Sequence, residues 1–135
     1  MVKINLNYEG SLRVKAEHAP SQKTLITDAP VDNHGKGESF SPTDLLATSL
    51  GTCMATIMGI VAERNQIDLK GMEISVEKTM SQDSPRRVAK LDVRFEIPAH
   101  VDPENKKLLE NAARTCPVAQ SISPKIELNV DFHWK

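Results

Sequence analysis

Residues 41–58 of this chain read SPTDLLATSLGTCMATIM, and this stretch decides the fold. It opens with a helix-start signal: Ser41 suits the N-cap, Pro42 suits the first turn, and Asp44 completes an acidic variant of the capping box. Apolar residues then occur on nearly every face, which predicts a long central helix, buried nearly all round and ending near residue 65. Because one small sheet can cover only one side of such a helix, we expect an intertwined homodimer.

Two glycines, Gly51 and Gly59, interrupt this predicted helix. Each costs about 1 kcal/mol relative to alanine in a helix interior. Their presence indicates that another backbone passes close to the helix. The predicted apolar stripe consists of Leu46, Leu50, Cys53, Ile57 and Ile60, widened by Leu45, Met54 and Val61.

Alternation of apolar and polar residues predicts strands on both sides of the helix. Three short strands over residues 2–8, 12–18 and 24–27 precede it, and a polar loop fills residues 28–40. Two strands follow around residues 69–76 and 88–97, then a second helix over residues 102–116, which Pro117 interrupts. A short helix or kinked continuation over residues 118–122 leads into a last strand over residues 126–134. The order β-β-β-α-β-β-α-β predicts a single α+β domain over residues 1–135.

The composition excludes several classes of protein. The net charge is −1, which gives no basic surface for nucleic acid, and only 3 Phe, 1 Tyr and 1 Trp are available for stacking on bases. The most apolar stretch, residues 45–61, is short and interrupted by Ser and Thr, so we expect no membrane span. The first residues lack the apolar core of a signal peptide. A cytoplasmic location, where thiols stay reduced, is the expectation.

Two cysteines, Cys53 and Cys116, are the candidate reactive groups. Taken by itself, Cys53 suits a small core residue better than a nucleophile, because free cysteine is often buried. Cys116 precedes Pro117 at a helix start, a position that lowers the pKa of a thiol. The four histidines are scattered and no Cys-x-x-Cys occurs, so we expect neither a metal nor another cofactor. Two thiols on two helices indicate redox chemistry that needs no cofactor.

Three sequence motifs add a family resemblance to this interpretation. They are Ser41-Pro42-Thr43-Asp44-Leu45-Leu46, Leu50-Gly51-Thr52-Cys53 and Cys116-Pro117-Val118. Together they resemble the OsmC/Ohr family, in a divergent OsmC-like branch, and the order of elements matches over nearly the whole chain. The resemblance implies an OsmC-like fold, an intertwined homodimer with two active sites at the subunit interface, and a cysteine-based peroxidase that reduces organic hydroperoxides.

The resemblance also implies roles for individual residues. Cys53 corresponds to the peroxidatic cysteine, which attacks the peroxide and becomes a sulfenic acid. Cys116 corresponds to the resolving cysteine, and an external dithiol such as a lipoyl group would restore both thiols. We expect an apolar wall to hold the substrate, formed by Leu46, Leu50, Ile57 and Met58.

The chain departs from the family pattern at one position. Family peroxidases carry a glutamate directly after the helix-starting proline, where this chain has Thr43, followed by Asp44. The loop over residues 28–40 contains no arginine. We therefore expect Arg13, on the second strand, to activate the thiolate, with Glu38 or Asp44 orienting it. Thr43, His34 and Lys36 are the other candidate orienting or substitute groups.

Two rival functions stay open. One is another thiol-redox or sulfur-transfer enzyme that uses the same cysteines. The other is a non-enzymatic OsmC-fold module that binds an apolar small molecule. The peroxidase hypothesis requires Cys53 within reach of Cys116, whereas the binding hypothesis does not.

Overall fold

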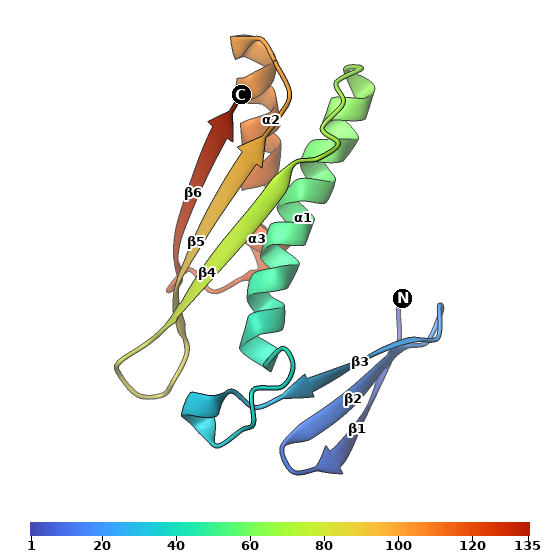
Figure 1. The fold of residues 1–135 in the computed structure, drawn as a ribbon, viewed down its shortest axis with the longest axis vertical. Helices are drawn as coiled ribbons and strands as arrows, with labels where there is room; N and C mark the ends of the chain where they lie inside the picture. The colour runs from blue at the N-terminus through green and yellow to red at the C-terminus, as the bar shows by residue number, and fades with distance from the viewer. The chain divides into compact units, whose positions relative to one another are not determined.

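The computed structural model describes residues 1–135, which form two compact units, Met1–Leu46 and Ala47–Lys135. Helix α1 (Pro42–Arg64) begins in the first unit and continues through the second. Figure 1 shows the elements of both units in chain order. Each unit has its own three-stranded sheet.

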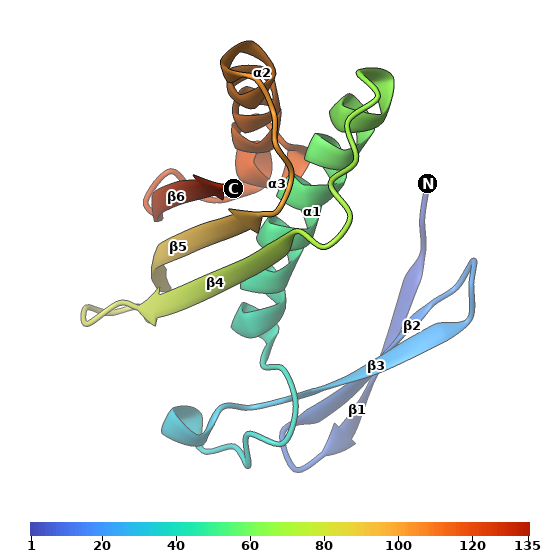
Figure 2. The same ribbon diagram turned by 45° about the horizontal axis from the view of Figure 1, so that its top comes forward.

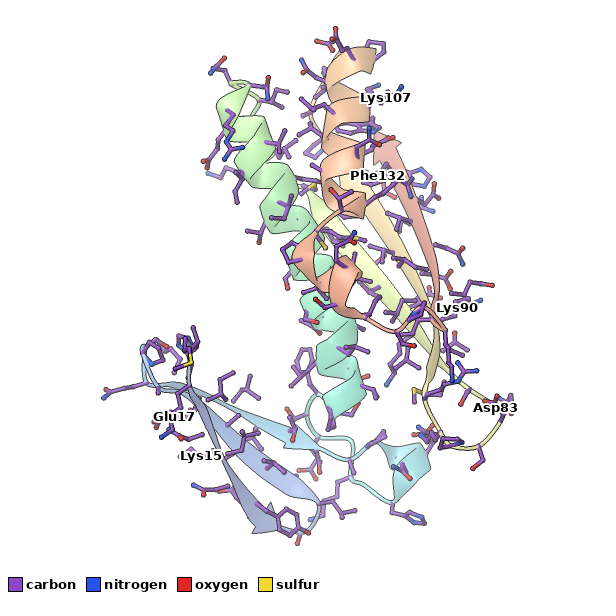
Figure 3. All side chains as sticks on the ribbon, turned by 180° about the vertical axis from the view of Figure 1, so that it is seen from behind. Lys15, Glu17, Asp83, Lys90, Lys107 and Phe132 are labelled. Carbon is purple, nitrogen blue, oxygen red and sulfur yellow. The ribbon has the colours of Figure 1, made fainter.

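The N-terminal unit is an antiparallel sheet in the order β1 (Ile4–Gly10), β2 (Arg13–His18) and β3 (Lys23–Asp28). A short 3₁₀ turn (Val31–Asn33) lies in the loop that leads to α1. Ile4, Leu6 and Tyr8 share one face of β1 and are 56%, 63% and 67% exposed in the single chain. Lys15 and Glu17 of β2, labelled in Figure 3, lie on the opposite face of the sheet from these three side chains.

The C-terminal unit contains β4 (Glu73–Met80), β5 (Val88–Ile97) and β6 (Glu127–Trp134) in that order. Strands β4 and β5 pair antiparallel, whereas β6 pairs parallel to β5. Two helices, α2 (Pro103–Arg114) and α3 (Pro117–Ser121), form the crossover from β5 to β6. Figure 2 shows α1 and α2 on the same side of this sheet.

The core of the C-terminal unit lies between the helices and the sheet. Phe95 is fully buried, and its ring stacks on Phe132 with centroids 4.9 Å apart. The other core side chains come from α1, β5 and α2: Leu50, Met54, Met58, Leu91, Val93, Ile97, Leu109 and Ala113. The opposite face of the sheet is polar, as the alternation of burial along β4 and β6 requires.

The predicted α+β fold is confirmed, with one addition. Helix α2 ends at Arg114, and Thr115 and Cys116 separate it from the five-residue α3. The two possibilities for residues 118–122 are thereby decided in favour of a separate short helix. Pro117 explains the break, because it has no N–H and disfavours helical geometry at Cys116.

The burial of α1 within the chain corrects the predicted apolar stripe, while the burial of the remaining faces by a second subunit stays a prediction. Only one stripe is buried within the chain, formed by Ala47, Leu50, Gly51, Met54, Met58 and Ala62. Cys53 and Ile57 are half-buried, and Ile60 is exposed. The physical reason is that one sheet and α2 provide only one apolar surface for this helix.

The two glycines of α1 have different surroundings. A Cβ atom on Gly51 would lie 2.9 Å from Cγ2 of Val76, so glycine here allows α1 to approach β4 closely. A Cβ atom on Gly59 would meet nothing within 4 Å. A close neighbour is therefore present at Gly51, as a side chain of the sheet and not as the expected backbone, and for Gly59 the expectation stays a prediction.

Helix α1 is also more apolar than expected. An 18-residue window has a mean hydropathy of 1.8, so α1 is long and apolar enough to cross a membrane by length and composition. The argument that the Ser and Thr residues make this segment too polar is therefore wrong, whereas the expectation of no membrane span stays a prediction. The core helix of a globular unit passes the same test, and α1 packs its buried stripe on a sheet.

Candidate functional site

Two free cysteines are brought together in the C-terminal unit. Cys53 lies on α1 and is half-buried, whereas Cys116 is 1% exposed and occupies the N-cap position of α3. The Cys116 sulfur accepts a hydrogen bond from the backbone N–H of Ala119 over 3.4 Å. The Cys53 side chain is close enough to the Cys116 thiol to act on its ionisation. The helix break at Pro117 thus places the second thiol beside the first.

The ionisation of Cys116 corrects the expectation of a low pKa. Burial raises the pKa of the Cys116 thiol because the thiolate loses its hydration. The N–H of Ala119 lowers that pKa, but the Cys53 side chain raises it again through a hydrogen bond and through charge. The net direction is upward, so the start of a five-residue helix does not offset burial beside a second thiol.

A second cluster of functional candidates lies within the N-terminal unit. Arg13 on β2 is directly opposite Asp28 on β3, and its Nη2 atom lies 3.4 Å from Asp28 Oδ2. The same guanidinium forms an ion pair with Glu38. The backbone N–H of Glu38 donates to Asp28 Oδ2 over 3.1 Å. One arginine therefore holds two carboxylates, one at the end of a strand and one in the following loop.

Asp28 is the buried member of this cluster. It is 1% exposed, and its Oδ1 atom has no hydrogen-bond partner. The N–H of Glu38 and the side chain of Arg13 lower the pKa of Asp28 against the opposing effect of burial. Glu38 and Asp28 in turn raise the pKa of Arg13, which stays a cation. Sequence reasoning did not include Asp28, although a carboxylate that ends a strand before a functional loop was a usable signal.

The other predicted polar groups do not join Arg13 within this unit. Asp44 caps α1: its N–H donates to Ser41 Oγ over 3.1 Å, and its Oδ2 accepts from the Ser41 N–H over 2.9 Å. Asp44 therefore completes the predicted capping box, and Glu38 is the one of the two predicted orienting carboxylates that pairs with Arg13. Thr43 Oγ1 lies 3.3 Å from Ser41 Oγ, also at the helix start.

The loop residues His34 and Lys36 are exposed. His34 adopts a left-handed conformation with φ of 67° at the end of the 3₁₀ turn. Neither side chain is among the groups that pair with Arg13 or Asp28.

The predicted apolar wall is partly corrected. Leu50 and Met58 are fully buried in the core, where they pack toward the sheet and cannot face an open substrate site. Leu46 and Ile57 are half-buried and keep an accessible part. No group of three or more His, Cys, Asp or Glu side chains is placed to hold a metal ion.

Residues 35–131, more than half of the chain, match the family described as OsmC-like protein. The chain belongs to the OsmC-like protein family. The predicted OsmC/Ohr resemblance is thereby confirmed.

Three relatives illustrate the range of similarity of this OsmC-like chain. A putative osmotic stress induced and detoxification response protein from Psychrobacter arcticus is 47% identical, with a TM-score of 0.93 over 98% of this chain and 96% of that one. An organic hydroperoxide resistance protein OsmC from Legionella pneumophila shares the fold, with 16% identity and a TM-score of 0.78 over 98% and 96% of the two chains. An uncharacterised protein from Methanocaldococcus jannaschii is 26% identical, over 96% of this chain and 72% of that protein.

Proposed function

We propose that this OsmC-like protein is a thiol peroxidase that reduces organic hydroperoxides, with Cys53 as the peroxidatic and Cys116 as the resolving cysteine. One observation carries the proposal: two free thiols, one half-buried and the other fully buried, are close enough in the C-terminal unit for Cys53 to act on the ionisation of Cys116. A peroxidatic sulfur must meet its substrate, and a resolving sulfur needs only to meet the first sulfur. The difference in exposure suits these two roles.

The proposed cycle balances without a metal or an organic cofactor. The Cys53 thiolate attacks the distal oxygen of ROOH, the O–O bond breaks, and the alkoxide takes a proton and leaves as ROH. The resulting sulfenic acid reacts with the Cys116 thiol, so that a disulfide forms and water leaves. A dithiol such as a lipoyl group reduces the disulfide and is itself oxidised, which returns both thiols.

Arg13 is the proposed activating cation. A half-buried thiol needs a positive charge near it to become a thiolate at neutral pH. The paired Glu38 and Asp28 hold the guanidinium in one orientation, and the planar fork of arginine suits such a double pairing. Glu38 thereby supplies, from the loop, the carboxylate that the family pattern has at the position of Thr43.

A homodimer is part of the proposal. Each unit by itself exposes apolar side chains in the single chain: the apolar face of β1 in the N-terminal unit, and Ile60 of α1 in the C-terminal unit. Extended apolar surfaces of this kind mark interaction sites. Sedimentation at micromolar concentration is expected to give about twice the mass of the chain, and a stable folded monomer would remove this part of the proposal.

The substrate class follows from the accessible apolar side chains and from the relatives. Leu46 and Ile57 keep accessible apolar area, which favours an organic hydroperoxide over hydrogen peroxide. The Legionella protein with the same fold is described as an organic hydroperoxide resistance protein, which supports the same class.

The decisive experiment is thiol counting after one equivalent of cumene hydroperoxide. The wild-type protein is expected to lose both thiols and release cumyl alcohol. The Cys53→Ser variant is expected to lose none, and the Cys116→Ser variant is expected to stop at a sulfenic acid that a dimedone probe captures. Retention of both thiols in the wild type would reject the peroxidase and favour the apolar binding module.

A further inference from the structure

We propose that Asp28 is a positioning residue of the peroxidase: one of its carboxylate oxygens closes the loop between β3 and α1 and, at the same time, holds Arg13 by a single nitrogen of its guanidinium. This inference rests on the proposed function for its catalytic meaning. The closure of the loop can be tested without a hydroperoxide. Asp28 and Glu38, the two carboxylates that pair with Arg13, thereby have different roles.

Asp28 connects the two ends of the loop between β3 and α1. Its backbone N–H donates to the carbonyl of Phe40 over 3.0 Å. Its Oδ2 atom accepts from the backbone N–H of Glu38, ten residues further along the chain, over 3.1 Å. A third hydrogen bond closes the same end of the loop, from Ser39 Oγ to the carbonyl of Ile26 over 2.7 Å. The place of the Glu38 backbone therefore depends on the Asp28 carboxylate.

The same oxygen of Asp28 also contacts Arg13. Asp28 Oδ2 lies 3.4 Å from Arg13 Nη2, and the antiparallel register places the two residues directly opposite each other on β3 and β2. One acceptor atom thus connects the second strand to the returning loop. Because the Asp28 side chain is 1% exposed, water does not compete for this oxygen, and a hydrogen bond to an ionised acceptor is stronger than one to a neutral acceptor.

Glu38 alone cannot hold Arg13 in one orientation. Its side chain is 61% exposed, and an ion pair in contact with water contributes little, because ordering two long side chains opposes it. Asp28 has a shorter side chain, is buried and lies on a strand. The backbone of Glu38 is held by Asp28, whereas the hydrogen bonds of Asp28 do not use the carboxylate of Glu38. Asp28 is therefore the fixed member of the cluster.

Both carboxylates approach the same nitrogen of Arg13. The contacts with Asp28 and with Glu38 are both made by Nη2. A guanidinium has five N–H groups, two of them on Nη2, so the three N–H groups on Nη1 and Nε stay available for an anion such as a thiolate. Because the guanidinium is planar and rigid, holding it at Nη2 sets the direction of this free edge.

The first measurement is the protection of the amide at position 38 against hydrogen exchange, read by NMR on the intact protein. Asp28→Ala removes the acceptor of this amide, so its protection is expected to fall about tenfold or more. Glu38→Ala keeps the backbone N–H and is expected to retain the protection. Glu17→Gln removes a negative charge from the face of β2 that carries Arg13 and is expected to change nothing. Unchanged protection in Asp28→Ala, or an equal fall over the whole N-terminal sheet, would overturn the inference.

The second measurement asks whether Asp28 acts through Arg13. The rate of thiol loss with cumene hydroperoxide is compared for Asp28→Ala, Arg13→Met and the double variant. Asp28→Ala is expected to slow the reaction about tenfold to a hundredfold, because the guanidinium is misplaced. The double variant is expected to be no slower than Arg13→Met, since no guanidinium remains to be positioned. A double variant slowed by the product of the two single effects would contradict a positioning role.

Asp28→Asn is the conservative variant, and it keeps the inference falsifiable if Asp28→Ala does not fold. Since Asp28 Oδ1 has no partner, asparagine can place its NH₂ group there and its carbonyl oxygen toward Arg13 and the Glu38 N–H. A neutral oxygen accepts more weakly, so a severalfold fall in protection at position 38 is expected, with recovery of most of the rate that Asp28→Ala loses. Protection equal to wild type, or no recovery of the rate, would count against the bridging oxygen.

The two measurements also separate this inference from the proposed function. Wild-type protein that keeps both thiols in cumene hydroperoxide would reject the peroxidase, and with it the catalytic meaning of Asp28, while the protection at position 38 would still decide the closure of the loop. Thiol loss in the wild type together with unchanged protection in Asp28→Ala would uphold the peroxidase and reject the role of Asp28.

Discussion

Gly51 and Gly59 offer a matched test of how α1 packs on its sheet. Both lie in the interior of the same helix, but only Gly51 is close to another element. A Cβ atom at position 51 would lie 2.9 Å from Val76 Cγ2 and 3.5 Å from Ile74 Cγ2. The first distance is shorter than carbon atoms tolerate, so either the stiff, β-branched side chain of Val76 or the spacing between α1 and β4 would have to change.

The two alanine variants are expected to move the free energy of unfolding in opposite directions. Gly59→Ala gains about 1 kcal/mol from helix propensity, with no clash to oppose it. Gly51→Ala has the same gain but loses about 1–3 kcal/mol to overpacking. The expected gap between the variants is therefore about 1–3 kcal/mol. In urea this gap corresponds to roughly 1 M in the midpoint, given a slope of about 1–3 kcal/mol per M.

The assay is urea unfolding followed by circular dichroism, at one protein concentration because dimerisation would add to stability. Val76→Ala combined with Gly51→Ala removes the clashing methyl groups. The double variant is expected to be more stable than the sum of the free-energy changes of the two single variants predicts. The difference, which is the coupling free energy between the two sites, is expected to be about 1–3 kcal/mol. Equal midpoints for Gly51→Ala and Gly59→Ala would refute the close approach at Gly51. A destabilised Gly59→Ala would instead indicate a neighbour from a second subunit.

Three further predictions concern the N-terminal unit and the helix start. The pKa of Asp28 is depressed in the folded protein, chiefly by the N–H of Glu38. Its contribution to stability is therefore present above the usual carboxyl pKa and is lost as pH falls below about 4. Asp28→Asn should reduce the fall of the urea unfolding midpoint at acid pH. Ser41→Ala removes the acceptor of the Asp44 N–H and should cost about 0.5–2 kcal/mol in chemical unfolding, while Ser41→Thr should retain most of it. Arg13→Met should stay dimeric in sedimentation but lose the fast reaction with cumene hydroperoxide, and an unchanged rate would exclude Arg13 from the mechanism.

The sequence predicted the elements better than it predicted their packing. The alternation in the last strand and the Ser41 cap are local signals, and both elements formed where these signals place them. The buried face of α1 was misjudged because apolar residues surround that helix, so its periodicity does not select one side. Ala47 and Ala62 belong to the buried stripe, although small side chains contribute little to a hydrophobic pattern.

The candidate site was predictable in its residue types and not in its electrostatics. The helix break at Pro117 indicated that Cys116 precedes a helix, and it does. The expectation of a low pKa for Cys116 was wrong, because burial raises that pKa more than the helix start lowers it, and burial depends on tertiary contacts. Arg13 and Glu38 were expected together, and they form an ion pair. The pairing of Asp28 with Arg13 depends on the register between β2 and β3, which no local sequence pattern provides.

The parallel pairing of β6 with β5 has a consequence for the stage of folding at which Cys53 and Cys116 become neighbours. Cys116 lies in the crossover between these strands, far along the chain from Cys53, so its position depends on the last strand joining the sheet. Contacts between distant parts of a chain form late in folding, because they require the ordering of the long intervening segment. The two sulfurs therefore meet only in a chain whose C-terminal strand has paired, and the ability to form the disulfide is a property of the completed fold.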